Sequence, residues 1–273
     1  MLNKNLLSTK DSKQTMIKEK ELQEKKIAVI TVFNNSQLVG QMKKSVYETI
    51  GNLSCTFYAM ENIGNAQFHS AAEAYNTFLD NVPDADVFIF CHQDILFLHD
   101  SLQTIYDLCC GNKKTLFGAA GVKNVGHGGD GRIISSMATV QEGWNYKTLP
   151  KGTTQDVFTL DECLICGSRE LFKTLRFDEQ VCDGWHLYAA ELCMQCHVKG
   201  IDVKVFDADI VHISGGTTDT SFFECEKKLV KKYRNTFPVI SYTSGWAYTD
   251  PVRYTLLRLY RRLRYGVYKG SEN

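Results

Sequence analysis

The sequence predicts an α/β protein in which helices flank a mostly parallel central sheet. Short apolar runs rich in β-branched residues, such as 27–33, alternate along the chain with stretches of helical spacing, such as 37–50. The apolar runs are continuous, which is typical of parallel strands that are buried on both faces. A chain of 273 residues with 44% hydrophobic residues can bury its own core, and we expect a single main domain.

The first half of the chain alternates strand and helix in a regular order. Each expected strand is an apolar run that ends at polar or turn residues, and each expected helix has apolar residues three or four positions apart. The expected strands are 27–33, 55–60, 86–91 and 116–122, and the expected helices are 37–50, 66–79 and 101–110. Parallel sheets bind ligands at the carboxyl ends of their strands, so the polar residues that follow these strands are the first candidates for a site.

The second half of the chain is less regular, but its elements still alternate. The expected strands are 157–166, 203–206 and 210–213, and the expected helices are a short one from 168, then 187–199 and 221–234. No internal repeat or linker interrupts this order, so we expect one domain over residues 26–249.

The two ends of the chain differ from this domain. Residues 1–25 are rich in Lys, Glu and Gln, which predicts a polar N-terminal arm. Residues 250–273 predict a basic amphipathic helix, whose apolar face along 250–269 either lies on the anionic inner face of a membrane or packs on the domain. Residues 251–273 hold six Lys or Arg and one Glu, within a chain of 31 basic and 31 acidic residues. This balance excludes a general nucleic-acid binder but not a membrane-surface partner.

The ten cysteines are expected to be reduced thiols. The first 26 residues hold no apolar stretch of signal-peptide length, so we expect a cytoplasmic protein. Two C-x-x-C pairs, Cys163 with Cys166 and Cys193 with Cys196, leave open a zinc-stabilised binding module. The first pair lies in an expected strand, where residues three apart point to opposite faces, which favours buried cysteines without metal.

Asp94 and His212 are the candidate metal ligands. Asp94 follows the expected strand 86–91, where its carboxylate can hold a divalent cation that bridges substrate phosphates or can cap the following turn. His212 lies near the end of the expected strand 210–213, where an imidazole can ligate a metal or pack in the core.

Three titratable side chains lie within nine residues of one another in the sequence, around the aromatic pair Trp185 and Tyr188. Any of Asp183, His186 and Glu191 can act as a general base. The alternative is that Asp183 caps the following helix and that Glu191 lies on a solvated surface.

These segments resemble the family-2-type glycosyltransferases of the GT-A fold, in particular the bacterial branch similar to streptomycin-biosynthesis glycosyltransferase domains. The resemblance covers roughly residues 26–216. It rests on the segments 27–34 (IAVITVFN), 71–76 (AAEAYN), 90–96 (FCHQDIL), 177–179 (FDE), 184–188 (GWHLY) and 212–216 (HISGG). Their order and spacing together are more specific than any one of them.

The resemblance implies an inverting enzyme that moves a sugar from a nucleotide-diphosphate donor to an acceptor hydroxyl. It also implies a role in bacterial surface polysaccharide or glycoconjugate synthesis, with a glycan or lipid-linked acceptor. The last Asp of the family's Asp-x-Asp-like motif matches Asp94, which implies Mn²⁺ or Mg²⁺, and His212 matches a His that completes the metal site in some relatives. The positions that match nucleotide-binding residues are Thr31, Phe33, Asn34, Glu61 and His92.

The resemblance leaves the catalytic base open. Many relatives have an acidic residue two positions before the one that matches Glu191, but that position is Ala189 in this chain. Glu191 is therefore the first choice, followed by Asp183 and His186. A sugar nucleotidyltransferase is the rival enzyme class, but the segment 33–37 (FNNSQ) lacks the glycines and the Arg or Lys that such an enzyme needs after its first strand.

Overall fold

The computed structural model describes residues 24–81, 84–123, 133–135, 137–139, 146–213 and 219–265. Most of the expected N-terminal arm, residues 214–216 of the last motif, and the expected C-terminal helix beyond residue 265 lie outside the described residues.

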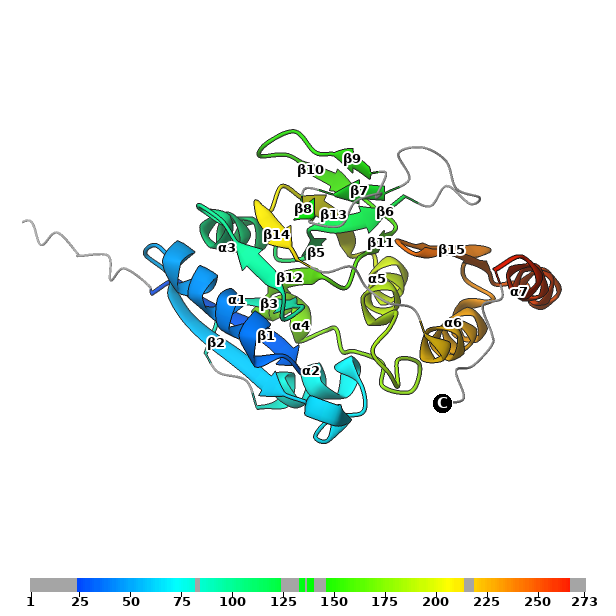
Figure 1. The fold of residues 1–273 in the computed structure, drawn as a ribbon. Helices are drawn as coiled ribbons and strands as arrows, with labels where there is room; N and C mark the ends of the chain where they lie inside the picture. Colours follow the sequence, from blue (N-terminus) through cyan, green and yellow to red (C-terminus); the bar gives the residue numbers. More distant parts are fainter. Residues whose placement is uncertain are drawn as a thin grey trace, which may run out of the picture.

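Seven strands form the central sheet of the described part of the chain (Figure 1). In chain order they are β1 (Lys26–Phe33), β2 (Ser54–Glu61), β3 (Val87–Cys91), β5 (Thr115–Gly118), β10 (Thr154–Asp156), β12 (Leu164–Ser168) and β13 (Asp202–Phe206). Their order across the sheet is β10-β13-β5-β12-β3-β1-β2. β2, β1, β3, β5 and β13 run in one direction, whereas β12 and β10 run in the other. The predicted α/β class with a mostly parallel sheet is confirmed.

Helices cover both faces of this sheet. The helices are α1 (Ser36–Thr49), α2 (Ala71–Asp80), α3 (Ser101–Gly111), α4 (Arg169–Phe172), α5 (Tyr188–Lys199), α6 (Thr220–Tyr233) and α7 (Pro251–Tyr265). Of these, α7 packs on β16, outside the central sheet. Ala28 and Ile30 of β1 pack in a cluster with α2, α5 and α6, whereas Ile27 and Val29 pack in a second cluster with α1 and α3. Because neighbouring residues of β1 face opposite clusters, the strand is apolar throughout.

Three smaller sheets flank the central one. β11 (Thr159–Leu160), β6 (Ala120–Val122), β7 (Ile133–Ser135) and β9 (Tyr146–Thr148) form one, and β4 (Ile95–Phe97), β14 (Ile210–His212) and β8 (Ala138–Thr139) form the second. β15 (Val239–Tyr242) and β16 (Gly245–Tyr248) form a hairpin. Most of these short strands have no clear sequence pattern, but the pairing of β4 with β14 positions the candidate site.

The expected strand 157–166 is two strands in the structure, β11 and β12. They are separated by a turn in which Asp161 Oδ1 accepts a hydrogen bond from the backbone N–H of Cys163 at 3.0 Å. Such Asx turns interrupt strands. β12 then runs antiparallel to β3, with Leu164 opposite Cys91, so the turn before β12 lies at the carboxyl end of β3.

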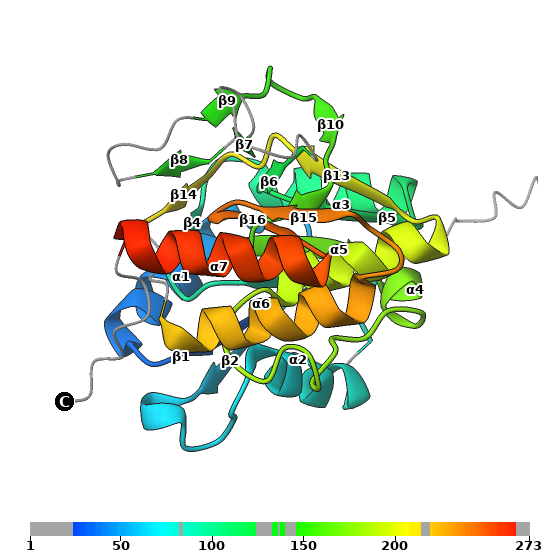
Figure 2. The ribbon, with the colours of Figure 1, turned by 90° about the vertical axis from the view of Figure 1, so that its right-hand side faces the viewer.

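Helices α6 and α7 lie side by side on one flank of the molecule, next to the β15–β16 hairpin (Figure 2). None of the helices in the described part of the chain is long and apolar enough to cross a membrane.

Candidate active site and metal centre

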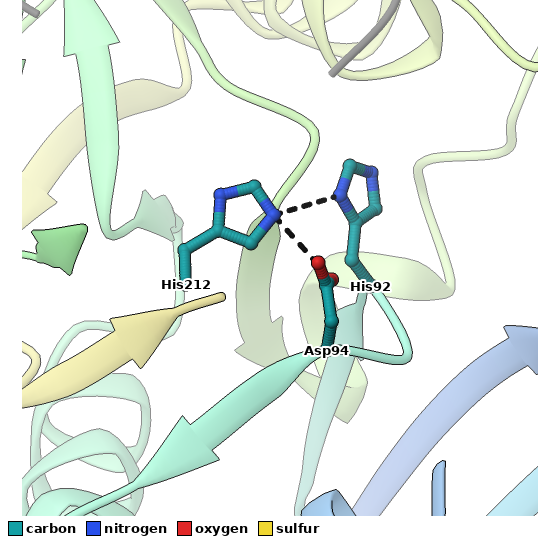
Figure 3. A group of neighbouring side chains, drawn as sticks. All are labelled: His92, Asp94 and His212. Atoms are coloured by element: carbon teal, nitrogen blue, oxygen red, sulfur yellow. Dashed lines mark hydrogen bonds and ion pairs between the residues drawn. The ribbon is translucent and has the colours of Figure 1, made fainter. Parts of the chain in front are cut away.

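His92, Asp94 and His212 meet at the carboxyl end of β3 (Figure 3). His92 and Asp94 directly follow β3, and His212 ends β14. The antiparallel pairing of β14 with β4, together with a 3.1 Å hydrogen bond from the N–H of Ile213 to the backbone carbonyl of Asp94, brings His212 to the other two. His212 Nε2 lies 3.5 Å from His92 Nδ1 and 3.4 Å from Asp94 Oδ1.

The chemistry of this group fits a divalent cation. The three ligand atoms lie within 4.8 Å of one another, and Asp94 is only 3% exposed. Burial and the neighbouring His212 lower the pKa of His92, which favours the neutral imidazole that has a lone pair to donate. Two imidazoles and one carboxylate suit a transition-metal ion such as Mn²⁺ better than Mg²⁺, which prefers ligand sets of oxygen alone.

The group opens into a cleft of about 560 Å³. Its walls come from the end of β1, the segment after β2, the turn before β12, the start of α5, α6 and the β15–β16 hairpin. Of the predicted nucleotide-binding residues, Phe33, Asn34 and His92 line this cleft. Of the candidate catalytic bases, His186 lines it. The predicted residues that do not line it are Thr31, Glu61, Asp183 and Glu191. Thr31 is fully buried in β1, and Glu61 is exposed at the end of β2.

Gln93 holds the loop between β1 and α1 at the rim of the cleft. Its Oε1 accepts hydrogen bonds from the backbone N–H groups of Asn34 at 3.0 Å and Asn35 at 2.9 Å. Its Nε2 donates to Asn34 Oδ1 at 2.8 Å. Gln93 is not among the residues predicted from the sequence, although its place between His92 and Asp94 is a signal for it.

Glu191, the first choice for the base, is a buried carboxylate outside the cleft. Its side chain is 0% exposed, and Lys232 Nζ lies 2.5 Å from its Oε1. Tyr233 Oη donates to the same oxygen at 2.8 Å, and Gln195 Nε2 donates to Oε2 at 2.7 Å. The expected alternative of a solvated surface position is therefore wrong. These contacts join α5 to α6 and give Glu191 a structural role.

Glu191→Ala is expected to lower the free energy of unfolding by about 2 kcal/mol, because it leaves Tyr233, Gln195 and the half-buried Lys232 without this acceptor. Chemical denaturation measures the loss. Glu170→Ala is the matched control, because Glu170 pairs with Lys113 on the surface and its loss should change stability by less than about 1 kcal/mol. If Glu191→Ala had the same free energy of unfolding as the original chain, the structural role of this carboxylate would be contradicted.

Asp183 and His186 have different surroundings. Asp183 pairs with Lys228 of α6, and the residue at the N-cap of α5 is Leu187, so the expected capping role of Asp183 is wrong. His186 lines the cleft, with its Nε2 at 3.3 Å from Asp219 Oδ1. Burial lowers the pKa of His186, against the opposing effect of Asp219, so the neutral imidazole is favoured.

Glu162 is a cleft residue that sequence reasoning missed. It follows Asp161 in the turn before β12 and lies close to the start of α5. Burial, together with the nearby charge of Asp161, raises the pKa of Glu162 to about 8, although the backbone N–H groups of Leu187 and Tyr188 favour the carboxylate. A cleft carboxyl group with a pKa near neutrality has the properties of a general base.

The four cysteines of the C-x-x-C pairs do not form a zinc site. Cys163 and Cys166 belong to one hydrophobic cluster, and Cys193 and Cys196 belong to the other. All four are buried thiols, and His92, Asp94 and His212 are the one group of possible metal ligands found among the described residues. The hypothesis of a zinc-stabilised binding module is therefore wrong.

The fold and this site define a protein of the GT-A class, with three potential metal ligands at the carboxyl end of a central strand. The chain belongs to the glycosyltransferase-like family, whose sequence model matches residues 28–237. The family resemblance is thus confirmed, while the narrower likeness to streptomycin-biosynthesis domains stays a prediction.

Two solved structures and one curated protein are similar to this chain. GalNAc-T7 with UDP, GalNAc and Mn²⁺ has a TM-score of 0.56 and 11% identity, over 79% of this chain and 49% of that one. A mutant of Drosophila β-1,4-galactosyltransferase 7 with manganese, UDP-Gal and xylobiose has a TM-score of 0.45 and 16% identity, over 70% and 71%. ORF 6 of the ATP synthase subunits region of Fuscovulum blasticum is 30% identical over 82 residues. The chain spans about a third of that protein and half of GalNAc-T7.

Proposed function

We propose that this protein is a metal-dependent glycosyltransferase that moves a sugar from a nucleotide-diphosphate donor to an acceptor hydroxyl. The observation that carries the proposal is the His92–Asp94–His212 group inside the cleft of a chain that belongs to a glycosyltransferase family. The presence of UDP, GalNAc and Mn²⁺ in GalNAc-T7, which shares the fold, supports a UDP-sugar as the first donor to test.

The donor nucleotide would bind at the β1 side of the cleft. Phe33, Asn34, Asn62 and Asn65 line this side and offer an aromatic ring and amide groups to a nucleoside. Gln93 keeps Asn34 in place before the ligand binds, which lowers the entropic cost of binding. Thr31 and Glu61 lie outside the cleft lining, so their nucleotide-binding role stays a prediction.

The cation would be held by Asp94, His212 and His92, and it would stabilise the negative charge that develops on the leaving diphosphate.

The acceptor would bind next to Trp185. The indole N–H of Trp185 is buried and has no hydrogen-bond partner among the described residues, and Trp185 lines the cleft. A buried donor without a partner is costly, and a sugar hydroxyl would satisfy it.

Glu162 is the base that we propose in place of the three sequence candidates. As the acceptor oxygen bonds to the anomeric carbon, its proton passes to the Glu162 carboxylate, and the bond from that carbon to the diphosphate breaks with its electron pair on the diphosphate. One such displacement inverts the anomeric centre. Glu162 is a stronger proton acceptor than His186, because burial raises the pKa of the acid and lowers that of the imidazole.

UDP-sugars are expected to raise the melting temperature of the protein more in Mn²⁺ than in Mg²⁺, because two imidazoles ligate Mn²⁺ more readily. A thermal-shift screen with and without each cation measures this. His212→Ala should lose the Mn²⁺-dependent part of the shift. His99→Ala should keep it, because the exposed His99 pairs with Asp209 outside the cleft. If His212→Ala kept the Mn²⁺-dependent rise in melting temperature, the assignment of His212 as a metal ligand would be wrong.

The biological setting is a proposal that depends on the sequence resemblance alone. It comprises a bacterial surface polysaccharide or glycoconjugate as product, a glycan or lipid-linked acceptor, and a cytoplasmic location. To separate the two acceptor classes, the protein is incubated with labelled UDP-sugars and either lipid-linked acceptors extracted from membranes or soluble glycan acceptors. The label should partition into the organic phase only when the acceptor is linked to a lipid.

A further inference from the structure

The apolar stripe of α7 points away from the domain. Val252, Leu256, Leu259 and Leu263 recur at steps of four, three and four residues and therefore share one face of the helix. Their exposed fractions are 67%, 60%, 51% and 78%. Large exposed apolar side chains that gather on one helix face mark an interaction surface.

A polar contact determines which face of α7 turns inward. Glu226 of α6 is fully buried, and Arg261 Nη1 donates to its two carboxylate oxygens at 2.8 and 3.2 Å. Tyr254 Oη donates to Glu226 Oε2 at 3.1 Å, and Tyr242 Oη of the hairpin donates to Oε1. This network anchors α7 through Tyr254 and Arg261. The expected alternative, in which the apolar face of the helix packs on the domain, is therefore wrong.

A basic groove of about 690 Å³ runs between α6 and α7, beside the stripe. Its cationic lining residues are Lys227, Lys231, Arg234, Arg258 and Arg262. None of the described residues that line it is acidic, and Tyr254, Leu259 and Pro251 add apolar atoms to its lining. We call the stripe and this groove together the α6–α7 face.

We propose that the α6–α7 face docks on a bilayer that contains anionic phospholipid. The exposed leucines would enter the boundary between headgroups and acyl chains, while the groove cations contact lipid phosphates. A second copy of this chain fits less well. A two-fold symmetric contact through this face would set the cations of one copy against those of the other, and like charges in apposition oppose association.

The α6–α7 face lies on elements that also build the cleft. Phe222 of α6 and Thr243 of the β15–β16 turn line the cleft, and α7 packs on β16. Docking would therefore hold the cleft beside the bilayer. The proposal does not depend on the transfer reaction, because vesicle binding can be measured without a donor or a cation.

Vesicle flotation with the full chain tests the proposal. We expect binding to vesicles of equal parts phosphatidylglycerol and phosphatidylcholine, weak binding to phosphatidylcholine alone, and weaker binding at high salt, because salt screens the attraction. Leu256→Gln with Leu263→Gln, and separately Lys231→Gln with Arg262→Gln, should each lower the affinity for the mixed vesicles at least tenfold. Gln keeps the helix propensity close to that of the residues replaced.

The control variant is Val198→Gln with Lys44→Gln, which removes an exposed apolar and an exposed basic side chain from α5 and α1. It should bind vesicles as the original chain does. Circular dichroism and melting verify that each variant is folded. Equal vesicle binding by the leucine variant and the original chain would overturn the proposal. So would a dimer in light scattering that the leucine variant dissociates, since a second copy would then cover the stripe.

Discussion

Asp94→Ala is expected to lower the rate of sugar transfer by about 100-fold or more and to abolish Mn²⁺ binding at the cleft. Asp94 supplies the only anionic ligand of the His92–Asp94–His212 group, and its side chain is almost fully buried. Without it, two neutral imidazoles remain to hold a doubly charged ion. A bound cation contributes several kcal/mol to the stabilisation of a leaving diphosphate, and about 1.4 kcal/mol corresponds to a tenfold change in rate.

Two readouts make this result specific. Calorimetric titration with Mn²⁺ follows the metal directly, and a UDP-release assay follows transfer. Asp94→Asn retains the shape of the side chain and should behave as Asp94→Ala does, because it also lacks the charge. Asp107→Asn removes a carboxylate from the exposed surface of α3 and should leave both readouts unchanged. Full Mn²⁺-dependent turnover by Asp94→Ala would remove this residue from the metal site.

Two members of the His92–Asp94–His212 group, Asp94 and His212, are predicted from the sequence as candidate metal ligands because they lie at the ends of apolar strands, whereas His92 is predicted only as a nucleotide contact. Asp94 directly follows the strand 87–91, and parallel strands gather their carboxyl ends at one edge of a sheet. The contact between His92 and His212 was not predictable from local pattern, since 120 residues separate them. Their proximity depends on the pairing of two strands of three residues each, β4 and β14, which periodicity does not reveal.

The sequence pattern does not reveal Glu162, because β12 runs antiparallel to both of its neighbours in the sheet. Where strands are parallel, the residues that follow each strand lie at the site edge, but β12 runs the other way. The residues at the site edge are then those before the strand. The expected strand 157–166 also spans the turn at Asp161, so the sequence pattern places Glu162 inside a strand.

The orientation of α7 also could not be predicted from local sequence pattern. The spacing of its leucines predicted an amphipathic helix but could not say which face turns inward. That choice depends on Glu226, which is buried on another helix and binds Arg261 and Tyr254. A buried carboxylate needs hydrogen-bond donors or a positive charge beside it. The polar side of α7 therefore packs on the domain, and its apolar side is exposed.

Glu162→Gln is expected to lower kcat by about 100-fold or more while leaving UDP-sugar binding nearly unchanged, because a general base typically contributes a factor of about 10² to 10⁴. Only the carboxylate form of Glu162 can accept the acceptor proton. Because burial raises its pKa to about 8, kcat/KM should rise with pH through about 8 and then level off. Glu162→Gln should lose this rise, since an amide does not titrate there.

The stability of the protein gives a second readout that does not depend on activity. The pKa of Glu162 is about 8 in the folded chain, against an ordinary value of 4.5. Between these pH values the folded state binds more protons at this group than the unfolded state does, so this group's contribution to the free energy of unfolding falls as pH rises. Chemical denaturation of Glu162→Gln should show a smaller loss over the same range.

Two further variants separate Glu162 from the other candidate bases. Glu191→Gln keeps a hydrogen-bonding side chain beside Lys232 and Tyr233 and should retain the midpoint near pH 8. His186→Asn changes a cleft residue, so it can lower kcat, but it should also retain that midpoint because its imidazole has a lowered pKa. A rise through pH 8 that persists in Glu162→Gln and disappears in one of these variants would assign the base to that residue, since the titration belongs to the group that takes the proton.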